Sequence, residues 1–187
     1  MQHFYCYHKL LIHNHPELAH KLLAKIAKVT IDYLNLQIDA GVNALQLFDS
    51  WALALSWNDY QEFSHQYNAQ IIAGLNRTNI PVISFCKGSS VFAPIMATAN
   101  PDVVSVDWNA DLLNIKQALP AGMAVQGNLD PHILYANKPV IKAEIHKLFE
   151  RMRGQDGFIF NLGHGIMPDI PFDNVKYAID VVKEFKY

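Results

Sequence analysis

Short apolar runs alternate along the chain with longer stretches in which apolar residues recur every three or four positions. The runs are continuous and closed by polar residues, which is typical of strands in a parallel sheet covered by helices. The longer stretches have the period of amphipathic helices. The sequence predicts strands near 44–49, 81–85, 103–107, 124–128 and 158–161. It predicts helices near 14–41, 59–75, 89–98, 111–119, 139–152 and 172–182.

The longest predicted helix runs from Asn14 to Gly41. Its apolar residues share one face, and their spacing predicts a stripe buried in the core. Residues 1–14 show no clear period, so we treat them as an atypical N-terminal segment and assign 15–187 to one barrel-like domain. The residues of the predicted buried stripe are Leu18, Leu22, Ile26, Val29, Tyr33 and Leu36.

Two α/β architectures fit five parallel strands that alternate with helices. One is an open, doubly wound sheet, and the other is a closed (β/α) barrel. A complete barrel needs eight strand–helix units and about 250 residues. With five units visible in 187 residues, the barrel alternative means a partial (β/α)8 TIM barrel with about five of its eight units.

The composition excludes several classes of protein. No run of about 18 apolar residues exists, so no membrane span is predicted. The net charge of −2 argues against nucleic-acid binding. Two cysteines, Cys6 and Cys86, cannot form a disulfide framework, which favours a cytoplasmic location. Only three arginines occur and none follows a strand, so a polyanion site here needs groups from elsewhere.

Ligands of parallel α/β folds bind at the carboxyl ends of the strands. Ser50 offers a hydroxyl there, although it also suits a turn or cap. His164 lies between two glycines, where a histidine can donate to a carboxylate, although a surface turn fits as well. Asp130 precedes Pro131 and is predicted to cap the next helix. The other residues predicted to line the site are Phe48, Asp49, Trp51, Asp107, Gln126, Asn128, Asn161, Gly163 and Gly165.

The sequence predicts no metal site. Zinc sites need three or four His, Cys or carboxylate ligands. Cys86 is the one cysteine at a strand end, and no histidine stands two residues before it.

Four segments in register resemble uroporphyrinogen decarboxylases: Phe48 to Ala52, Val106 to Trp108, Gln126 to Pro131 and Phe160 to Pro168. The resemblance extends along nearly the whole chain from about Pro16. It implies a (β/α)8 barrel, usually a homodimer, in tetrapyrrole and heme biosynthesis. Such enzymes decarboxylate the four acetate arms of uroporphyrinogen III to give coproporphyrinogen III, without a cofactor. The resemblance also implies that Ser50 and His164 contact substrate carboxylates.

The chain departs from the family pattern in several places. The family's arginine-rich motif and key aspartate precede the segments matched here and cannot be placed. Leu53 stands where the family usually has glycine, and Trp57 where it usually has proline. We therefore expect a truncated or split form, with residues 1–14 foreign to the family and little activity on its own. Its expected partners are a second copy or a complementing N-terminal half.

Two alternatives compete with the decarboxylase. A zinc-dependent corrinoid or thiol methyltransferase of the same barrel superfamily predicts a His-x-Cys pair after the strand at 81–85, where this chain has Ser84-Phe85-Cys86. A non-catalytic relic that binds a porphyrin or a protein partner is the other alternative.

Overall fold

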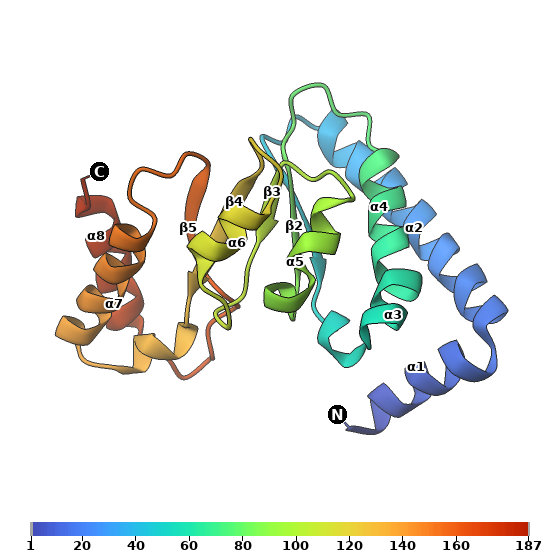
Figure 1. Cartoon of the computed structure of the whole chain (residues 1–187), viewed down its shortest axis with the longest axis horizontal. Helices are drawn as coiled ribbons and strands as arrows, with labels where there is room; N and C mark the ends of the chain where they lie inside the picture. Colours follow the sequence, from blue (N-terminus) through green and yellow to red (C-terminus); the bar gives the residue numbers. More distant parts are fainter. Residues whose placement is uncertain (1, 187) are drawn as a thin grey trace.

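The computed structural model describes residues 2–186 and shows one curved sheet with helices along its outer face (Figure 1). The five strands are parallel and follow one another in the order β1-β2-β3-β4-β5. They confirm the five predicted strands, with boundaries that differ by at most two residues. The strands are β1 Leu45–Asp49, β2 Val82–Cys86, β3 Val103–Ser105, β4 Ala124–Leu129 and β5 Phe158–Leu162.

The strand order distinguishes the two architectures that the strand–helix pattern left open, and it confirms the partial (β/α)8 barrel that the resemblance implied. A doubly wound sheet reverses its strand order and carries helices on both faces. Here each strand pairs with the one before it, and right-handed crossovers of that kind put all connecting helices on one face. The fold is therefore part of a (β/α) barrel, with β1 and β5 as its two edge strands.

Helices occupy the six predicted regions, and one further helix precedes them. This is α1, which contains Ile12; that side chain packs with Ala19 and Phe63. Two 3-10 turns follow β1 and β4, and a π-helical turn joins α3 to α4. The bounds are α1 Gln2–Asn14, α2 Pro16–Asp39, η1 Ala52–Ala54, α3 Trp57–Tyr60, η2 Gln61–His65, α4 Gln66–Ala73, α5 Ser89–Ala97, α6 Leu112–Ala118, η3 Pro131–Tyr135, α7 Lys138–Arg151 and α8 Phe172–Glu184.

Three apolar clusters fill the space between the sheet and its helices. The first joins α2 and α4 to β1 and β2 and includes Leu45 and Val82. The second lies under α5 and α6 and includes Val104. The third joins α7, α8 and β5 and includes Ile145. Since all three lie on the helix side, the core leaves the concave face of the sheet free for ligands.

The predicted burial of the α2 stripe is wrong. Its six apolar side chains are 48% to 66% exposed, from Leu22 at the lower end to Leu36 at the upper. The helix instead buries Ala19, Ala27 and Leu34 on another face. Periodicity identifies the apolar side of a helix, but it does not reveal whether the chain itself supplies something to cover that side. The uncovered stripe continues the exposed edge of β1.

Within residues 2–186, none of the helices combines the length and apolar character that a membrane crossing requires.

Candidate functional site

A row of side chains crosses the concave face of the sheet. Phe48 pairs with Phe85, Phe85 with Ser105, and Ser105 with Gln126. Because side chains alternate between the two faces of a strand, these residues point away from the helices. The Phe48 and Phe85 rings meet edge to face at 5.7 Å. Gln126 is buried and its Nε2 donates to Ser105 Oγ at 3.1 Å, so it contributes to the floor rather than offering a free amide.

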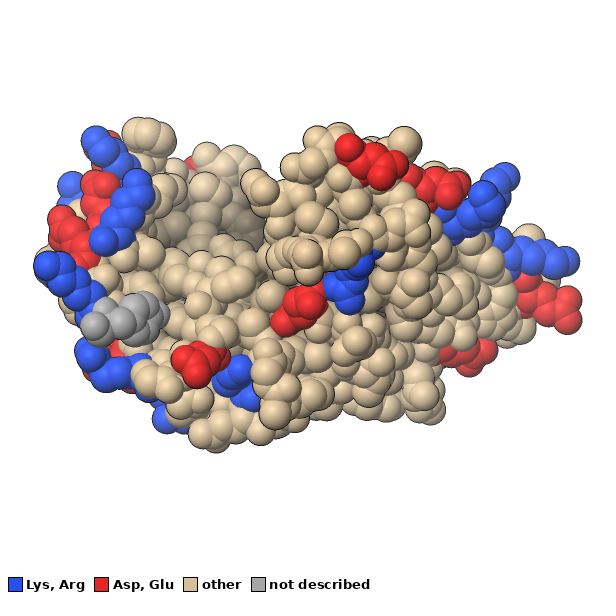
Figure 2. All heavy atoms as spheres, turned by 90° about the horizontal axis from the view of Figure 1, so that it is seen from above, with Lys and Arg blue, Asp and Glu red and all other residues tan. Residues whose placement is uncertain are grey.

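A cleft of about 360 Å³ lies over this row and brings together Ser50 and His164, which are far apart in the sequence. Phe48, Asn161 and Gly165, which are among the residues expected at a site, line this cleft too. The space-filling view shows a molecule hollowed between its two ends, with charges mostly on the outer surface and few on the hollow's walls (Figure 2). Among the described residues lining the cleft, none is acidic and none is an arginine.

His164 is held between two aromatic rings. Its ring lies 6.1 Å from Phe85 and 6.2 Å from Trp108, edge to face in both cases. Gly163 brings the loop this close: a Cβ there would lie 2.5 Å from the Trp108 backbone nitrogen. Gly163 N also donates to Leu129 O at 2.8 Å. Neither ring nitrogen of His164 has a hydrogen-bond partner within the described part of the chain, so both are available to a ligand.

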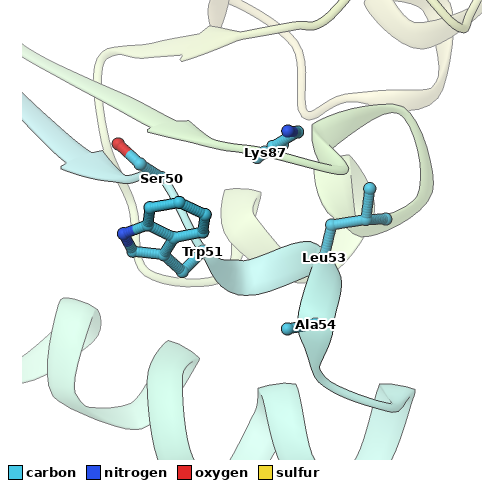
Figure 3. A pocket seen from close by; sticks show the side chains of 5 residues that line it. All are labelled: Ser50, Trp51, Leu53, Ala54 and Lys87. Atoms are coloured by element: carbon cyan, nitrogen blue, oxygen red, sulfur yellow. The ribbon is translucent and has the colours of Figure 1, made fainter. Parts of the chain in front are cut away.

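Ser50 also lines a second pocket of about 320 Å³, beside the first (Figure 3). Trp51, Leu53, Ala54 and Lys87 form its other walls. Lys87 follows β2 and was not among the predicted site residues, because the expected anion site rested on arginine, whose guanidinium binds two oxygens at once. Its position at a strand end was the signal that could have identified it.

Asp107 has a structural role. It is 2% exposed, and its Oδ2 accepts from Gly88 N at 2.9 Å. Its Oδ1 accepts from Ser90 Oγ and from Asn109 N, the latter at 3.1 Å. Asp107 was expected to line the site, but its carboxylate is occupied by donors from Gly88, from α5 and from its own loop.

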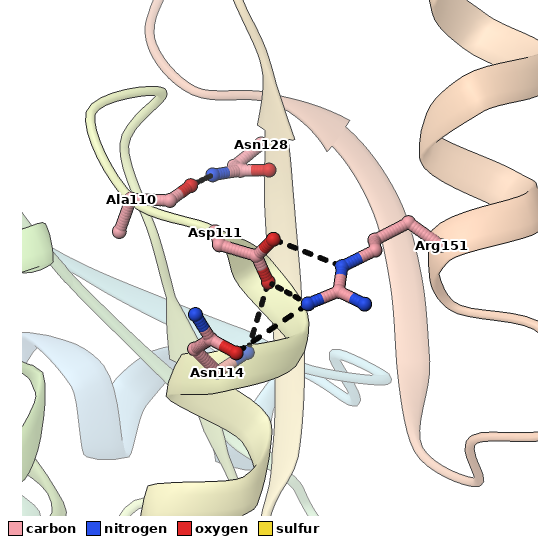
Figure 4. Close-up of polar contacts among 5 residues, drawn as sticks. All are labelled: Ala110, Asp111, Asn114, Asn128 and Arg151. Atoms are coloured by element: carbon pink, nitrogen blue, oxygen red, sulfur yellow. Dashed lines mark hydrogen bonds and ion pairs between the residues drawn. The ribbon is translucent and has the colours of Figure 1, made fainter.

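Asn128 fixes the same corner of the molecule from β4. Its Nδ2 donates to Asp107 O at 2.9 Å and to Ala110 O at 2.7 Å (Figure 4). In this way it ties the end of β4 to the loop that opens α6. Like Asp107, Asn128 supports the cleft walls and does not line the cleft.

Asp49 points to the helix side of β1, where its Oδ2 accepts from Ser64 Oγ. Two buried groups, the Tyr60 phenol and the Cys86 thiol, lie near Asp49. Burial raises the pKa of the phenol, and burial also raises the pKa of the thiol, to about 12. Asp49 was expected to line the site, but its carboxylate bonds to Ser64 on the helix side and does not line the cleft.

The residues present do not form a zinc site. Among the described side chains, those of residues 7–186, no group of three or more His, Cys, Asp or Glu lies close enough to share an ion. Cys86 is buried and its Sγ lies 3.4 Å from Met96 Sδ, away from His164. The ligand set required by the methyltransferase alternative is therefore missing from this part of the chain.

Comparison with known proteins gives the same family. The uroporphyrinogen decarboxylase (URO-D) family matches residues 4–185, a range that begins inside the segment treated above as atypical. Uroporphyrinogen decarboxylase of Protochlamydia amoebophila is 48% identical over 92% of this chain and 47% of its own length. That of Chloroherpeton thalassium is 43% identical over 96% of this chain and 52% of its own length. The chain thus spans about half the length of the curated relatives it matches.

Solved structures share the fold at lower identity. A methyltransferase from Methanosarcina mazei superposes with a TM-score of 0.71 at 22% identity, over 85% of this chain and 47% of its own. A putative vitamin-B12 independent methionine synthase from Listeria monocytogenes gives 0.65 at 16% identity, over 90% and 56%. At these identities the likeness concerns the barrel fold alone. The family match over residues 4–185 confirms the resemblance found in the four sequence segments, and this chain belongs to the uroporphyrinogen decarboxylase family.

Proposed function

We propose that this chain supplies one side of a uroporphyrinogen decarboxylase site, where Ser50 and His164 hold acidic arms of the tetrapyrrole. One observation carries the proposal: in this chain, a member of the family, Ser50 and His164 line the same cleft, and neither side chain has a hydrogen-bond partner among the described residues. A hydroxyl and an imidazole can each donate to a carboxylate. The apolar floor that Phe48 and Phe85 provide suits the face of a pyrrole ring.

The chemistry needs more groups than this cleft contains. Protonation of a pyrrole ring next to its acetate arm gives a cation into which the electrons of the breaking carbon–carbon bond can move. A proton donor must supply that proton, and a carboxylate must stabilise the cation. Asp49 and Asp107 are both engaged away from the cleft. We therefore predict that the chain alone forms little or no coproporphyrinogen, and that further units complete the site.

The α2 stripe and the β1 edge indicate where those units dock. The exposed side chains of the stripe, such as Leu22, Ile26 and Val29, lie on the helix that precedes β1, and β1 is an edge strand with one unpaired edge. A cavity of about 600 Å³ between α2 and β1 has Ile26, Phe48 and Trp51 in its walls. We propose that its occupant is a polypeptide with strand–helix units like those of this chain, whose strand extends the sheet and whose helix covers the stripe.

Association with the half of the Protochlamydia amoebophila relative that this chain does not match tests the docking surface. Ile26→Glu puts a charge into the stripe and is expected to abolish the complex in size-exclusion chromatography with light scattering. Ala24→Glu puts the same charge at an exposed position of α2 on nearly the opposite side of the helix from Ile26, so it is the matched control and is expected to leave the complex intact. Self-association of the chain alone, lost in Ile26→Glu, would identify a second copy as the occupant and contradict this assignment.

Binding of uroporphyrin, the stable oxidised form of the substrate, tests the acid-binding role. Trp51 and Trp108 lie at the two pockets, so saturable quenching of tryptophan fluorescence reports occupancy. His164→Ala is expected to weaken binding about tenfold, as loss of a charge-assisted hydrogen bond does. His146→Ala, on the remote helix α7, should bind like the unaltered chain. Equal affinities for all three proteins would refute the role of His164.

A cytoplasmic location remains a prediction from cysteine usage.

A further inference from the structure

Lys87 lies at the point where the second pocket meets the cleft. Its backbone nitrogen donates to Asp49 O at 3.0 Å, which continues the β1–β2 pairing by one position and places Lys87 beside Ser50. The side chains of Asp49 and Cys86 turn to the helix side, toward Ser64 and Met96. Alternation along a strand therefore directs Ser50 and Lys87 to the concave side.

The pocket around Lys87 is built for an anion attached to an apolar body. Lys87 and Ser50 provide a cation and a hydroxyl, and Trp51, Leu53 and Ala54 provide apolar walls (Figure 3). Gly88 lets Leu53 come close, since a Cβ on Gly88 would lie 2.8 Å from Leu53 Cδ1. A carboxylate on a flat aromatic ring matches this combination of groups.

The Lys87 ammonium has no counter-ion in the described part of the chain. No acidic side chain forms an ion pair with it. The neighbouring strands β1 and β3 end at Asp49 and Asp107, and both carboxylates have other partners. Asp49 accepts from Ser64, and Asp107 accepts from three other donors. A half-buried ammonium next to apolar walls is stabilised when a ligand brings the missing negative charge.

We propose that Lys87 binds a second carboxylate arm of the substrate, together with Ser50 and separately from His164. This inference rests on the proposed function and extends it. Ser50 lines both pockets, so one tetrapyrrole can reach Lys87 with one arm and His164 with another. Lys87 then provides part of the positive charge that the scarcity of arginine leaves missing.

Two variants that each remove one positive charge, and a third that keeps it, test the role of Lys87, with tryptophan quenching by uroporphyrin as the readout. Lys87→Met is expected to weaken binding about tenfold. Lys142→Met removes the same charge from the exposed side of α7 and should change the affinity less than about twofold. Lys87→Arg keeps the charge and should stay within about threefold of the unaltered chain. Circular dichroism confirms that each variant is folded, and Lys87→Gln replaces Lys87→Met if the latter is not.

The outcomes separate the two proposals. If Lys87→Met binds uroporphyrin like Lys142→Met while His164→Ala binds weakly, the inference about Lys87 is overturned and the proposed function stands. If the unaltered chain does not bind uroporphyrin, both fail together. Equal losses in Lys87→Met and Lys142→Met also overturn the inference, because they show a general charge effect. A loss confined to Lys87→Met and restored in Lys87→Arg supports it.

Discussion

Replacing Asp107 by asparagine tests whether this carboxylate supports the cleft walls. It is 2% exposed and accepts hydrogen bonds from Gly88 N, Ser90 Oγ and Asn109 N. An asparagine keeps one acceptor oxygen and replaces the other by an NH₂ donor. Ser90 can turn its hydroxyl to accept from that NH₂. Whichever way the amide is oriented, however, the backbone N–H of Gly88 or of Asn109 then faces a donor.

The size of the effect follows from that count of donors. One buried N–H without an acceptor destabilises a fold by about 1–3 kcal/mol. We therefore expect Asp107→Asn to lower the free energy of unfolding by about 2 kcal/mol, or the Tm by about 4–8 °C in a domain of this size. Asp107→Ala removes the acceptor for all three donors and should cost about 4 kcal/mol.

Chemical denaturation followed by circular dichroism measures both variants. Asp180→Asn, an exposed change on α8, is the control and should stay within about 0.5 kcal/mol of the unaltered chain. If Asp107→Asn unfolds at the same denaturant concentration as Asp180→Asn, then Asp107 is not a structural acceptor and a role in ligand binding has to be reconsidered.

Three further predictions concern other parts of the fold. Gly163→Ala forces a Cβ against the backbone of the loop after β3, and should destabilise the chain by about 1–3 kcal/mol in thermal unfolding; an unchanged Tm would contradict the close approach. Asp111 caps α6 and accepts from Arg151 Nε at 2.9 Å (Figure 4), which lowers the pKa of its carboxyl group. The contribution of the Asp111 carboxylate to folding stability is therefore present at neutral pH, declines as the pH falls below about 4 and disappears once the pH passes the lowered pKa. Asp111→Ala should cost about 1 kcal/mol more stability than Asp111→Asn, which keeps a capping oxygen. Equal urea midpoints for the two variants would contradict this. In a Cys6→Ser background, Cys86 with its pKa of about 12 should react with a thiol reagent at pH 8 only after unfolding; fast labelling of the native chain would show that its burial is wrong.

Local patterns in the sequence were sufficient to predict the five strands and six helical regions, but not α1, because residues 1–14 show no clear apolar period. The short apolar runs predicted the strands, although only the helix side of the sheet is fully covered here and Phe48 and Ile159 stay exposed on their strands. The polar residue after each run marks the ligand side. Asp130 caps η3 as expected, with Oδ1 accepting from His132 N at 2.9 Å. The choice between an open sheet and a barrel needed the strand order, which the sequence pattern does not contain.

The errors have physical causes as well. The α2 stripe was predicted to be buried because its residues have a regular apolar period. Such a period does not indicate whether the same chain contains a surface that covers them. Asp107 was grouped with the ligand-binding residues because its place after β3 resembles that of Ser50 after β1. The direction of a side chain at a strand end depends on its register, and register is visible only once the strands are paired. Lys87 was not predicted as a site residue, although it too follows the carboxyl end of a strand.

Reconstituted catalysis is the measurement that tests the central claim most directly. The chain is mixed with the unmatched half of the Protochlamydia amoebophila relative, and coproporphyrinogen formed from uroporphyrinogen is measured by chromatography. We predict product from the mixture, at least about a hundredfold less in mixtures with His164→Ala, as for loss of a group that holds the substrate in register, and unchanged product with His146→Ala. A stable mixed complex that forms no product, or one in which His164→Ala is as active as the unaltered chain, would contradict the claim that this cleft is one side of a decarboxylase site.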